Sequence, residues 1–524
     1  MEELRILNLE FGETMRFKES IWKQKSRMSW LKEGDSNSAF FHRAVKFKAK
    51  RKMVNRMKFG NYWYSNPMAL KEKLVNYFSD HFSCLLRNWK MDFVLNFKRL
   101  SDSEASNLEL PFSMEEIKEA VWSCDENKAP GPDGFNICFF RKCWGVVKND
   151  LYEMLKEFYL SRKLERCISS SFISLIPKNE NPSKISKFRP IYLVSSLYKI
   201  VAKVLSRRLS GVVGGVVSDT QCAFIRGRQN FYGILIANEI IHSIKKKAVE
   251  GGSLILKLDF AKAYDCVRWD FLELVLLKMG FGVRWTGWML ECVSTARAAV
   301  LINGAVTNEF KFSRGLRQGD PLSPFLFILV TEALHLMLVK VKEIGMIEGI
   351  KSIIPRESIS HLQFADDTIL FLRADENVVR NSKYILCCFE MFSGLSINFS
   401  KSCIVGFDLE EEFLYRLAAV YRCRIGELPI NYLGLPLGVD PRRSTSWNGI
   451  IDRVERRLSG WKCQSLSWVG RVVLINSVLS SMPIYFLSIF QAHSAVVKKI
   501  DKIRRNFLWG NVGGCRKMAK IRWK

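Results

Sequence analysis

The spacing of hydrophobic and polar positions changes along the chain. In the C-terminal part, apolar residues recur every three or four positions, as at Ile450, Val454 and Leu458, and this spacing predicts helices. In the centre, residues 253–260 and 361–372 are short apolar runs typical of strands, and helical stretches such as 320–343 separate them. Strands that alternate with helices, followed by a helical tail, indicate an α+β protein: a mixed core with an all-α appendage.

Acidic residues stand at the ends of these predicted strands. Alternation along 253–260 puts its leucines on one face and Asp259 on the other, at the end of the strand. Asp366 and Asp367 are adjacent between two apolar runs, which indicates the turn of a β-hairpin. A lone Asp is usually a cap, and a turn is often simply polar, but adjacent like charges repel unless a cation lies between them. Three carboxylates on neighbouring strands would bind Mg²⁺.

The segment RGLRQGDPLSP (314–324) lies between these acidic units. Its glycines allow close approach of the backbone, and its prolines stiffen the start of the apolar helix that follows. Arg314 and Arg317 can pair with phosphate. An ordinary loop before a helix explains the glycines and prolines, but it does not explain two arginines beside Gln318.

The charge balance points to a polyanionic partner. The chain has 80 Lys and Arg against 52 Asp and Glu, a net charge of +28, and nucleic acid is favoured over a membrane surface. One basic run, 16–58, is interleaved with tryptophans and phenylalanines, and another fills 498–524. For the first run we favour RNA contact over a solvated helix face.

Cysteine and histidine usage argues against zinc and against secretion. The fourteen cysteines form no C-x-x-C pair and the six histidines are scattered, so we expect free thiols in a reducing, intracellular compartment. The stretch 472–497 carries no formal charge, but it contains Pro483 and many polar residues. We therefore predict buried helices broken at Pro483 and no membrane span.

Three segments in order, LKLDFAKAYD (256–265), RGLRQGDPLSP (314–324) and FADD (364–367), resemble the central palm motifs of reverse transcriptases. The chain is similar to the polymerase of non-LTR (LINE-type) retrotransposons, especially those of flowering plants. The likeness extends to further segments: WLKEGDSNSAFFH (30–42), KAPGPDGF (128–135), LIPK (175–178), FRPI (188–191), AFIRGRQ (223–229), GLSINFSKS (394–402), YLGLPLG (432–438), GRVVLINSVLSSMPIYFLSIF (470–490) and FLWG (507–510).

The resemblance implies a right-handed polymerase with fingers, a ferredoxin-like palm and a helical thumb. We expect a basic, mainly helical N-terminal extension over 1–106, fingers and palm over 107–440, the thumb over 441–510 and a basic tail over 511–524. KAPGPDG is expected to be a structural loop. Full-length elements of this kind usually also encode an endonuclease and a Cys/His-rich region. Neither is found in this sequence, so we expect a truncated copy.

The resemblance also implies roles for individual residues. Asp259 and Asp366 would bind two Mg²⁺ ions, which Mn²⁺ can replace, with Asp367 in support and the Phe260 carbonyl as a further ligand. Lys401 matches a lysine proposed to donate a proton to pyrophosphate. The remaining expected residues are Lys178, Arg189, Tyr264, Gln318 and Gly319 for the nucleotide, and Arg314, Arg317, Tyr432, Leu433 and Gly434 for template and primer.

Tyr264 distinguishes classes of template-copying enzyme. It lies five residues after Asp259, where a bulky ring fills the space that a ribose 2′-hydroxyl would need. RNA-dependent RNA polymerases commonly place a polar residue at this point. The alternative role for Tyr264 is core packing.

The expected function is RNA-directed DNA polymerisation: a primer 3′-hydroxyl attacks the α-phosphate of a deoxynucleoside triphosphate on an RNA template. The DNA primer or target would be the third partner, and the resemblance implies a nuclear location. Two alternatives stay open. One is a catalytically inactive, nucleic-acid-binding remnant of a truncated element, and the other is an intron-encoded maturase-type reverse transcriptase.

Overall fold

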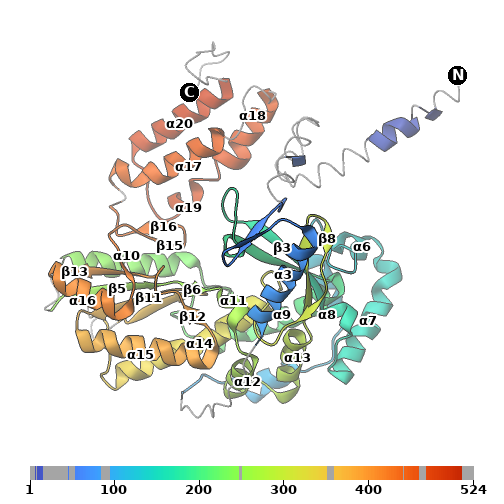
Figure 1. Ribbon diagram of the computed structural model, residues 1–524, viewed down its shortest axis with the longest axis horizontal. Helices are drawn as coiled ribbons and strands as arrows, with labels where there is room; N and C mark the ends of the chain where they lie inside the picture. Colours follow the sequence, from blue (N-terminus) through green and yellow to red (C-terminus); the bar gives the residue numbers. More distant parts are fainter. Residues whose placement is uncertain are drawn as a thin grey trace. The chain divides into compact units, whose positions relative to one another are not determined.

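The computed structural model describes residues 6–7, 9–15, 45–46, 53–83, 95–246, 251–350, 359–440, 442–459 and 468–509. The chain divides into two compact units. One comprises Val54–Gly438, and the other comprises Met1–Met53 with Val439–Lys524. The predicted mixture of strands and helices is confirmed, and the strands of the sheets lie in the Val54–Gly438 unit (Figure 1).

A five-stranded sheet, here called the central sheet, forms one half of the Val54–Gly438 unit. Its strand order is β10-β11-β5-β13-β14, so strands far apart in sequence become neighbours. Helix α10 (Asn230–Lys246) covers one face, while α14 (Ser323–Glu343) and α15 (Glu376–Ser393) cover the other (Figure 1). The strands are β5 (Ser253–Leu258), β10 (His361–Phe364), β11 (Asp367–Arg373), β13 (Cys403–Phe407) and β14 (Arg424–Ile425).

The central sheet is buried on both faces near the start of β5. Leu254, Leu256 and Leu258 are at most 1% exposed, as the alternation predicted, but Ile255 on the opposite face is 0% exposed. A strand covered on both sides reads as a nearly continuous apolar run, and this explains the sequence of β5. The buried strand holds the residue that follows it, Asp259, in a fixed place at the edge of the core.

A second five-stranded sheet has β3 (Ser170–Pro177) at its centre. It pairs antiparallel with β4 (Phe188–Val194) and parallel with β7 (Arg297–Ile302). Two short strands, β8 (Ala305–Val306) and β9 (Phe310–Lys311), complete it on β7. Helix α9 (Ser196–Val216) starts directly after β4 and buries one face along its length.

The loop KAPGPDG packs against the start of α9, as expected of a structural loop. A Cβ on Gly131 would lie 2.4 Å from the Val194 carbonyl oxygen, so only glycine fits there. The Ser196 amide donates to Asp133 at 2.5 Å, and the Lys199 ammonium donates to the Ala129 carbonyl at 3.2 Å.

The range 54–82, which the sequence assigned to an N-terminal extension, lies in the same compact unit as both sheets. It forms the hairpin of β1 (Met57–Phe59) and β2 (Tyr62–Tyr64), then α3 (Pro67–Phe82). Asn66 caps α3 by accepting from the amides of residues 68 and 69, and proline occupies its first turn. The buried face of α3 contacts β7 and β9.

Shorter elements connect these layers. Among them, β6 pairs with β12 and β15 pairs with β16, each as a two-stranded antiparallel ladder. The connecting elements, in which η marks a 3-10 helix, are α4 (Asp102–Leu108), α5 (Met114–Ser123), α6 (Ile137–Lys142), α7 (Trp144–Ser161), α8 (Arg166–Ser169), η2 (Ile185–Lys187), β6 (Phe260–Ala261), α11 (Ala263–Cys266), α12 (Trp269–Lys278), α13 (Val283–Ser294), β12 (Ser396–Ile397), α16 (Glu411–Tyr421), β15 (Ile430–Tyr432) and β16 (Leu435–Leu437).

The described C-terminal residues form a small helical unit. Ile450 and Val454 are buried as their spacing predicted, and so are Val496 and Phe507. The chain turns at residues 480–483, so the predicted break at Pro483 is confirmed. The elements are η3 (Ser444–Trp447), α17 (Asn448–Ser459), α18 (Trp468–Leu474), η5 (Ile475–Leu479), α19 (Ile484–Leu487) and α20 (Ser494–Trp509).

Two described helical stretches, Ser323–Glu343 and Trp468–Leu487, are long and apolar enough to cross a membrane by length and composition alone. The first is α14, whose apolar window is 61% buried. The apolar window of the second is 33% buried, so the predicted burial of the helices around Pro483 is not confirmed. Of the basic run 16–58, the tryptophans Trp22 and Trp30 lie outside the described residues.

Candidate active site

The predicted convergence of carboxylates follows from the register of the central sheet. On β5 and β11, Leu258 pairs with Thr368, so the next position along brings Asp259 level with Asp367. Residues directly opposite in an antiparallel pair point to the same face. The two carboxylates therefore leave the sheet on one side, although 107 residues separate them in sequence.

Asp366 occupies the tip of the predicted hairpin. Phe364 pairs with Asp367, which leaves Ala365 and Asp366 as a two-residue turn between β10 and β11. Ala365 has φ +53°, a conformation that usually requires glycine at the first position of such a turn. Asp366 is exposed at the tip, while Ala365 beneath it is 4% exposed.

The carboxylates influence one another. Protein around the Asp366 carboxyl raises its pKa, and the negative charge of Asp259 raises it further. The pKa of Asp367 is also raised, mainly by burial, with contributions from both other carboxylates, while Lys257 opposes the shift. Negative charge is thus concentrated where a cation would stabilise it.

Asp259 is anchored through its backbone, which leaves its side chain to face the site. Its amide donates to the Ser402 hydroxyl at 3.1 Å, and its carbonyl accepts from the Asn398 amide at 2.7 Å. The second bond makes Phe260 and Ile397 a non-hydrogen-bonded pair of the β6–β12 ladder. The Phe260 carbonyl therefore points away from β12, as a carbonyl that binds a cation must.

Basic side chains lie near the Asp259 carboxylate. The Lys401 ammonium lies 4.0 Å from Asp259 Oδ1. Burial lowers the pKa of Lys178, and the positive charges of Lys401, Arg189 and Lys262 lower it further. Lys178 and these three side chains form a cluster of positive charges, and an anion with several charges would reduce the repulsion among them.

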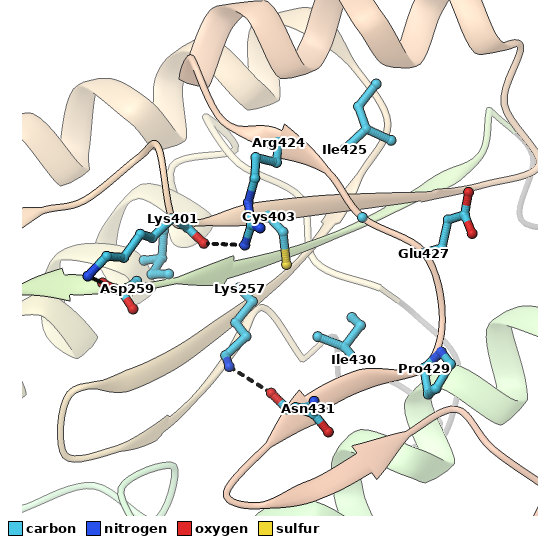
Figure 2. A pocket seen from close by; sticks show the side chains of 12 residues that line it. Lys257, Asp259, Lys401, Cys403, Arg424, Ile425, Glu427, Pro429, Ile430 and Asn431 are labelled. Atoms are coloured by element: carbon cyan, nitrogen blue, oxygen red, sulfur yellow. Dashed lines mark hydrogen bonds and ion pairs between the residues drawn. The ribbon is translucent and has the colours of Figure 1, made fainter. Parts of the chain in front are cut away.

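A cavity of about 290 Å³ opens beside Asp259 (Figure 2). Lys257, on the same strand face as Asp259, crosses it and donates to the Asn431 carbonyl at 2.7 Å. Arg424 donates to the Lys401 carbonyl at 3.0 Å and so fixes the backbone that carries this lysine. Through its bond to Asn431, Lys257 connects the β15–β16 hairpin to the strand that precedes Asp259.

Tyr264 lies next to the carboxylates and also packs in the core. Its ring stacks on Phe327 of α14 with centroids 4.7 Å apart. Burial raises the pKa of Tyr264, and the charge of Asp366 raises it further. The two roles weighed for this residue are therefore compatible: the ring is fixed by packing, and its hydroxyl end is near Asp366.

Two other predicted sites are backbone features. Gln318 accepts from the Tyr192 amide at 3.1 Å through its carbonyl, and Gly319, with φ +105°, is exposed beside it. Leu433 and Gly434, with φ +49° and +84°, form the turn between β15 and β16. Tyr432 is 1% exposed, and burial together with the charge of Asp367 raises its pKa.

The expectation that Arg317 meets nucleic acid is wrong. Arg317 is 4% exposed, and its guanidinium donates to the Ser169 and Cys292 carbonyls at 3.1 and 3.0 Å. It also pairs with the buried Asp320 at 3.1 Å and stacks over Tyr198. These partners use the guanidinium and bury it, so a phosphate has no access to it.

Arg314 is also directed into the protein. Its guanidinium donates twice to the His81 carbonyl at the end of α3, at 3.2 and 2.7 Å, and the side chain is half-buried. The expectation of a template or primer contact is not supported by this geometry. The arginines of 314–324 instead join this loop to segments that lie far away in sequence.

The carboxylates fit a divalent cation that a substrate helps to bind. Within the described residues, no three His, Cys, Asp or Glu side chains converge closely enough to hold a metal by themselves. Mg²⁺ is usually bound by one or two carboxylates together with substrate phosphates and water, without a complete cage of protein ligands. Neighbouring carboxylates beside a cluster of basic side chains match that donor set.

Comparison with known families identifies the chain. The reverse transcriptase (RNA-dependent DNA polymerase) family matches residues 176–437, half of the chain, and this range holds every carboxylate and lysine of the site. The chain belongs to the reverse transcriptase family. Reverse transcriptases generally use divalent metal ions, which agrees with the donor set described above.

Relatives of this chain include proteins of a transposon and of retrotransposable elements, as the motifs predicted. It is 28% identical to a 149 kDa protein of transposon TX1 from Xenopus laevis, over 93% of this chain and 37% of that protein. It is 26% identical to a Pol polyprotein of retrotransposable element R2 from Popillia japonica, over 56% of this chain and 39% of that protein. The chain thus spans about two-fifths of the length of these relatives.

Among solved structures, the chain is similar to apo telomerase from Candida tropicalis. The sequence identity is 13%, the match covers 72% of this chain and 69% of that chain, and the TM-score is 0.37.

Sequence reasoning missed two lysines of this reverse transcriptase. Lys257 could have been found, because strand alternation puts it on the face of Asp259. Lys262 has φ +50° and donates to the Tyr77 hydroxyl of α3 at 2.7 Å. Nothing in the local sequence indicates that contact, because the two residues are 185 positions apart.

Proposed function

We propose that this chain is an RNA-directed DNA polymerase of a LINE-type retrotransposon. The observation that carries the proposal is the placement of Asp259 level with Asp367, with Asp366 at the adjoining turn and the basic side chains of Lys401 and Lys178 near Asp259. Nucleotidyl transfer requires carboxylates that bind metal ions, next to basic side chains that bind the phosphates. The central sheet would be the palm, the β3–β4 region the fingers and the C-terminal helices the thumb.

Each group near the site has a proposed task. Asp259 and Asp366, with Asp367 and the Phe260 carbonyl in support, would hold two Mg²⁺ ions, and Mn²⁺ could replace them. Bound there, the ions would supply electrostatic stabilisation to the reacting oxygens. Lys178 and Arg189 would bind the triphosphate, and Lys401 would protonate the departing pyrophosphate.

The remaining contacts set which nucleotide and which strands are used. The fixed ring of Tyr264 would exclude a ribose 2′-hydroxyl and so select deoxynucleotides. Gln318 and Gly319 would border the nucleotide, and the Leu433–Gly434 turn above Tyr432 would contact the primer. An RNA template and a DNA primer would be the macromolecular partners, and the net charge of +28 suits both.

The test is removal of one carboxylate without loss of its shape. Asp366→Asn should abolish extension of a DNA primer on an RNA template with Mg²⁺ and labelled dTTP. Affinity for the primed template should stay close to that of the wild type. Glu427→Gln is a matched control, because it removes a charge from a carboxylate that lines the cavity beside Asp259.

Three outcomes would discriminate the readings. Near-normal extension by Asp366→Asn would contradict the assignment. No extension by a wild-type chain that folds and binds RNA would favour the inactive nucleic-acid-binding remnant. An equal loss in Glu427→Gln would show that charge in the cavity matters, whereas the proposal gives the essential role to the hairpin carboxylate.

A further inference from the structure

The β10–β11 hairpin that carries the carboxylates has a second neighbour besides β5. Residues 218–222 run along the other edge of β10, where Gln221 and Gln363 form a parallel bridge. The Gln363 amide donates to the Thr220 carbonyl at 3.0 Å, and the Cys222 amide donates to the Gln363 carbonyl at 3.2 Å. The hairpin is therefore held between two strands, one on each side.

The side chain of Gln221 reaches the turn itself. Gln221 is 1% exposed, and its Oε1 accepts from the amide of Ala365 at 2.9 Å and from the amide of Ala223 at 3.1 Å. Two amide donors on one oxygen fix the orientation of its side-chain amide group. The bond thus ends on the residue directly before Asp366.

The hydrogen bond from the Ala365 amide to Gln221 acts at a residue whose backbone conformation is unfavourable. Ala365 has φ +53°, which any residue with a Cβ adopts reluctantly. An acceptor that binds the Ala365 amide favours this conformation over the more common ones. It therefore favours the one turn geometry that presents Asp366 and Asp367 toward Asp259.

Gln221 is held by groups that belong to other elements. Glu332 of α14 accepts from the Ser218 amide at 3.1 Å and from its hydroxyl at 3.0 Å. Arg228 donates to a cluster of backbone carbonyls around the same segment: Gly214, Val217, Ser218 and Gln221, at 2.5–3.2 Å. The acceptor is thus rigidly placed before it meets the turn.

We propose that Gln221 is a positioning residue for nucleotidyl transfer: its side-chain carbonyl locks the Ala365 turn so that Asp366 is presented to the site. The inference rests on the proposed polymerase function. Gln221 contacts no substrate, and it acts through the turn. Gln363 provides a matched comparison, since it is also 1% exposed but its side-chain atoms have no hydrogen-bond partner in the described part of the chain.

The experiment measures single-nucleotide incorporation on a primed RNA template with three variants of the full chain. Gln221→Met keeps the volume but removes the acceptor, and the maximal incorporation rate should fall about tenfold. The KM for the nucleotide and the affinity for primed template should not change. Gln363→Met should incorporate at the wild-type rate.

The third variant tests the mechanism directly. Ala365→Gly in the Gln221→Met background should restore most of the lost rate, because glycine adopts positive φ without strain. Circular dichroism and thermal unfolding of each variant show whether it is folded.

Four results would overturn the inference: an unchanged rate in Gln221→Met, an equal loss in Gln363→Met, no rescue by Ala365→Gly, or a Gln221→Met chain that does not fold. The wild-type reaction separates the two proposals. An active wild type with an unaffected Gln221→Met refutes the positioning role alone. A folded wild type that incorporates nothing refutes the polymerase and the positioning role together.

Discussion

Lys401 provides a sharp test of how the site handles protons. The ammonium lies 4.0 Å from Asp259, and its side chain is 66% exposed. An exposed ion pair at this distance contributes less than about 1 kcal/mol to stability. Lys401→Met should therefore leave the free energy of unfolding almost unchanged, so any large effect on the reaction reports the chemistry.

The expected effect on the reaction is much larger. A positioned general acid accelerates proton transfer by roughly 10²–10⁴-fold, which corresponds to about 3–5 kcal/mol of barrier. If Lys401 protonates the leaving pyrophosphate, Lys401→Met should lower the single-turnover rate within that range. Lys401→Arg keeps the positive charge beside Asp259 but cannot release a proton at neutral pH, so it should be nearly as slow.

The assay is rapid-quench incorporation of one nucleotide at saturating and limiting concentrations, which separates the chemical rate from nucleotide binding. Chemical denaturation of each variant provides the stability control. Full activity of Lys401→Arg would show that only the charge is needed. Full activity of Lys401→Met would remove this residue from the mechanism.

Three further changes test other parts of the structure. Tyr264→Val removes the ring that stacks on Phe327, so discrimination against ribonucleotides in single-nucleotide incorporation should fall at least about tenfold. Arg317→Met leaves the buried Asp320 without the cation that pairs with it, and urea unfolding should show a loss of about 3–5 kcal/mol. Burial raises the pKa of Glu332 from 4.5 to about 7. Between pH 4.5 and pH 7 the unfolded chain releases this proton before the folded chain does, so the free energy of unfolding of the wild type should fall by about 3 kcal/mol as the pH rises. Glu332→Gln removes this loss, and its stability relative to wild type should rise across that window in denaturation series at fixed pH.

Each of these expectations has an opposite result. Unchanged ribonucleotide discrimination would leave Tyr264 a packing residue only. Arg317→Met with full stability but weakened RNA binding would restore the phosphate contact that the structure argues against. A stability difference between Glu332→Gln and wild type that does not vary with pH would mean that this carboxyl titrates normally.

The carboxylates could be predicted from sequence because their signals are local. Strand alternation placed Asp259 at a strand end, and adjacent acids between apolar runs indicated the hairpin of Asp366 and Asp367. Antiparallel pairing of β5 with β11 then brings the two segments level. The resemblance to a known family added Lys178 and Lys401, and both of them lie near Asp259 in the structure.

The errors and omissions concern contacts between distant segments. An arginine that binds phosphate and one that binds carbonyls look identical in a sequence, and Arg317 reaches Ser169 across 148 positions. Gln221 meets Ala365 across 144 positions, and its neighbours in sequence give no sign of the contact. Such roles depend on how the elements pack, which hydrophobic spacing does not specify.

The packing of α3 determines which N-terminal boundary an expressed fragment can have. Phe78 and Phe82 stack on Phe310 with centroids 6.0 and 6.4 Å apart, and the Ser313 amide donates to the Phe82 carbonyl. A fragment that comprises only 176–437 would lack α3 and expose Phe310 to solvent, and such an exposed apolar surface promotes aggregation. Soluble fragments of the Val54–Gly438 unit should begin upstream of Val54, whose amide and carbonyl are both bound by Asn303.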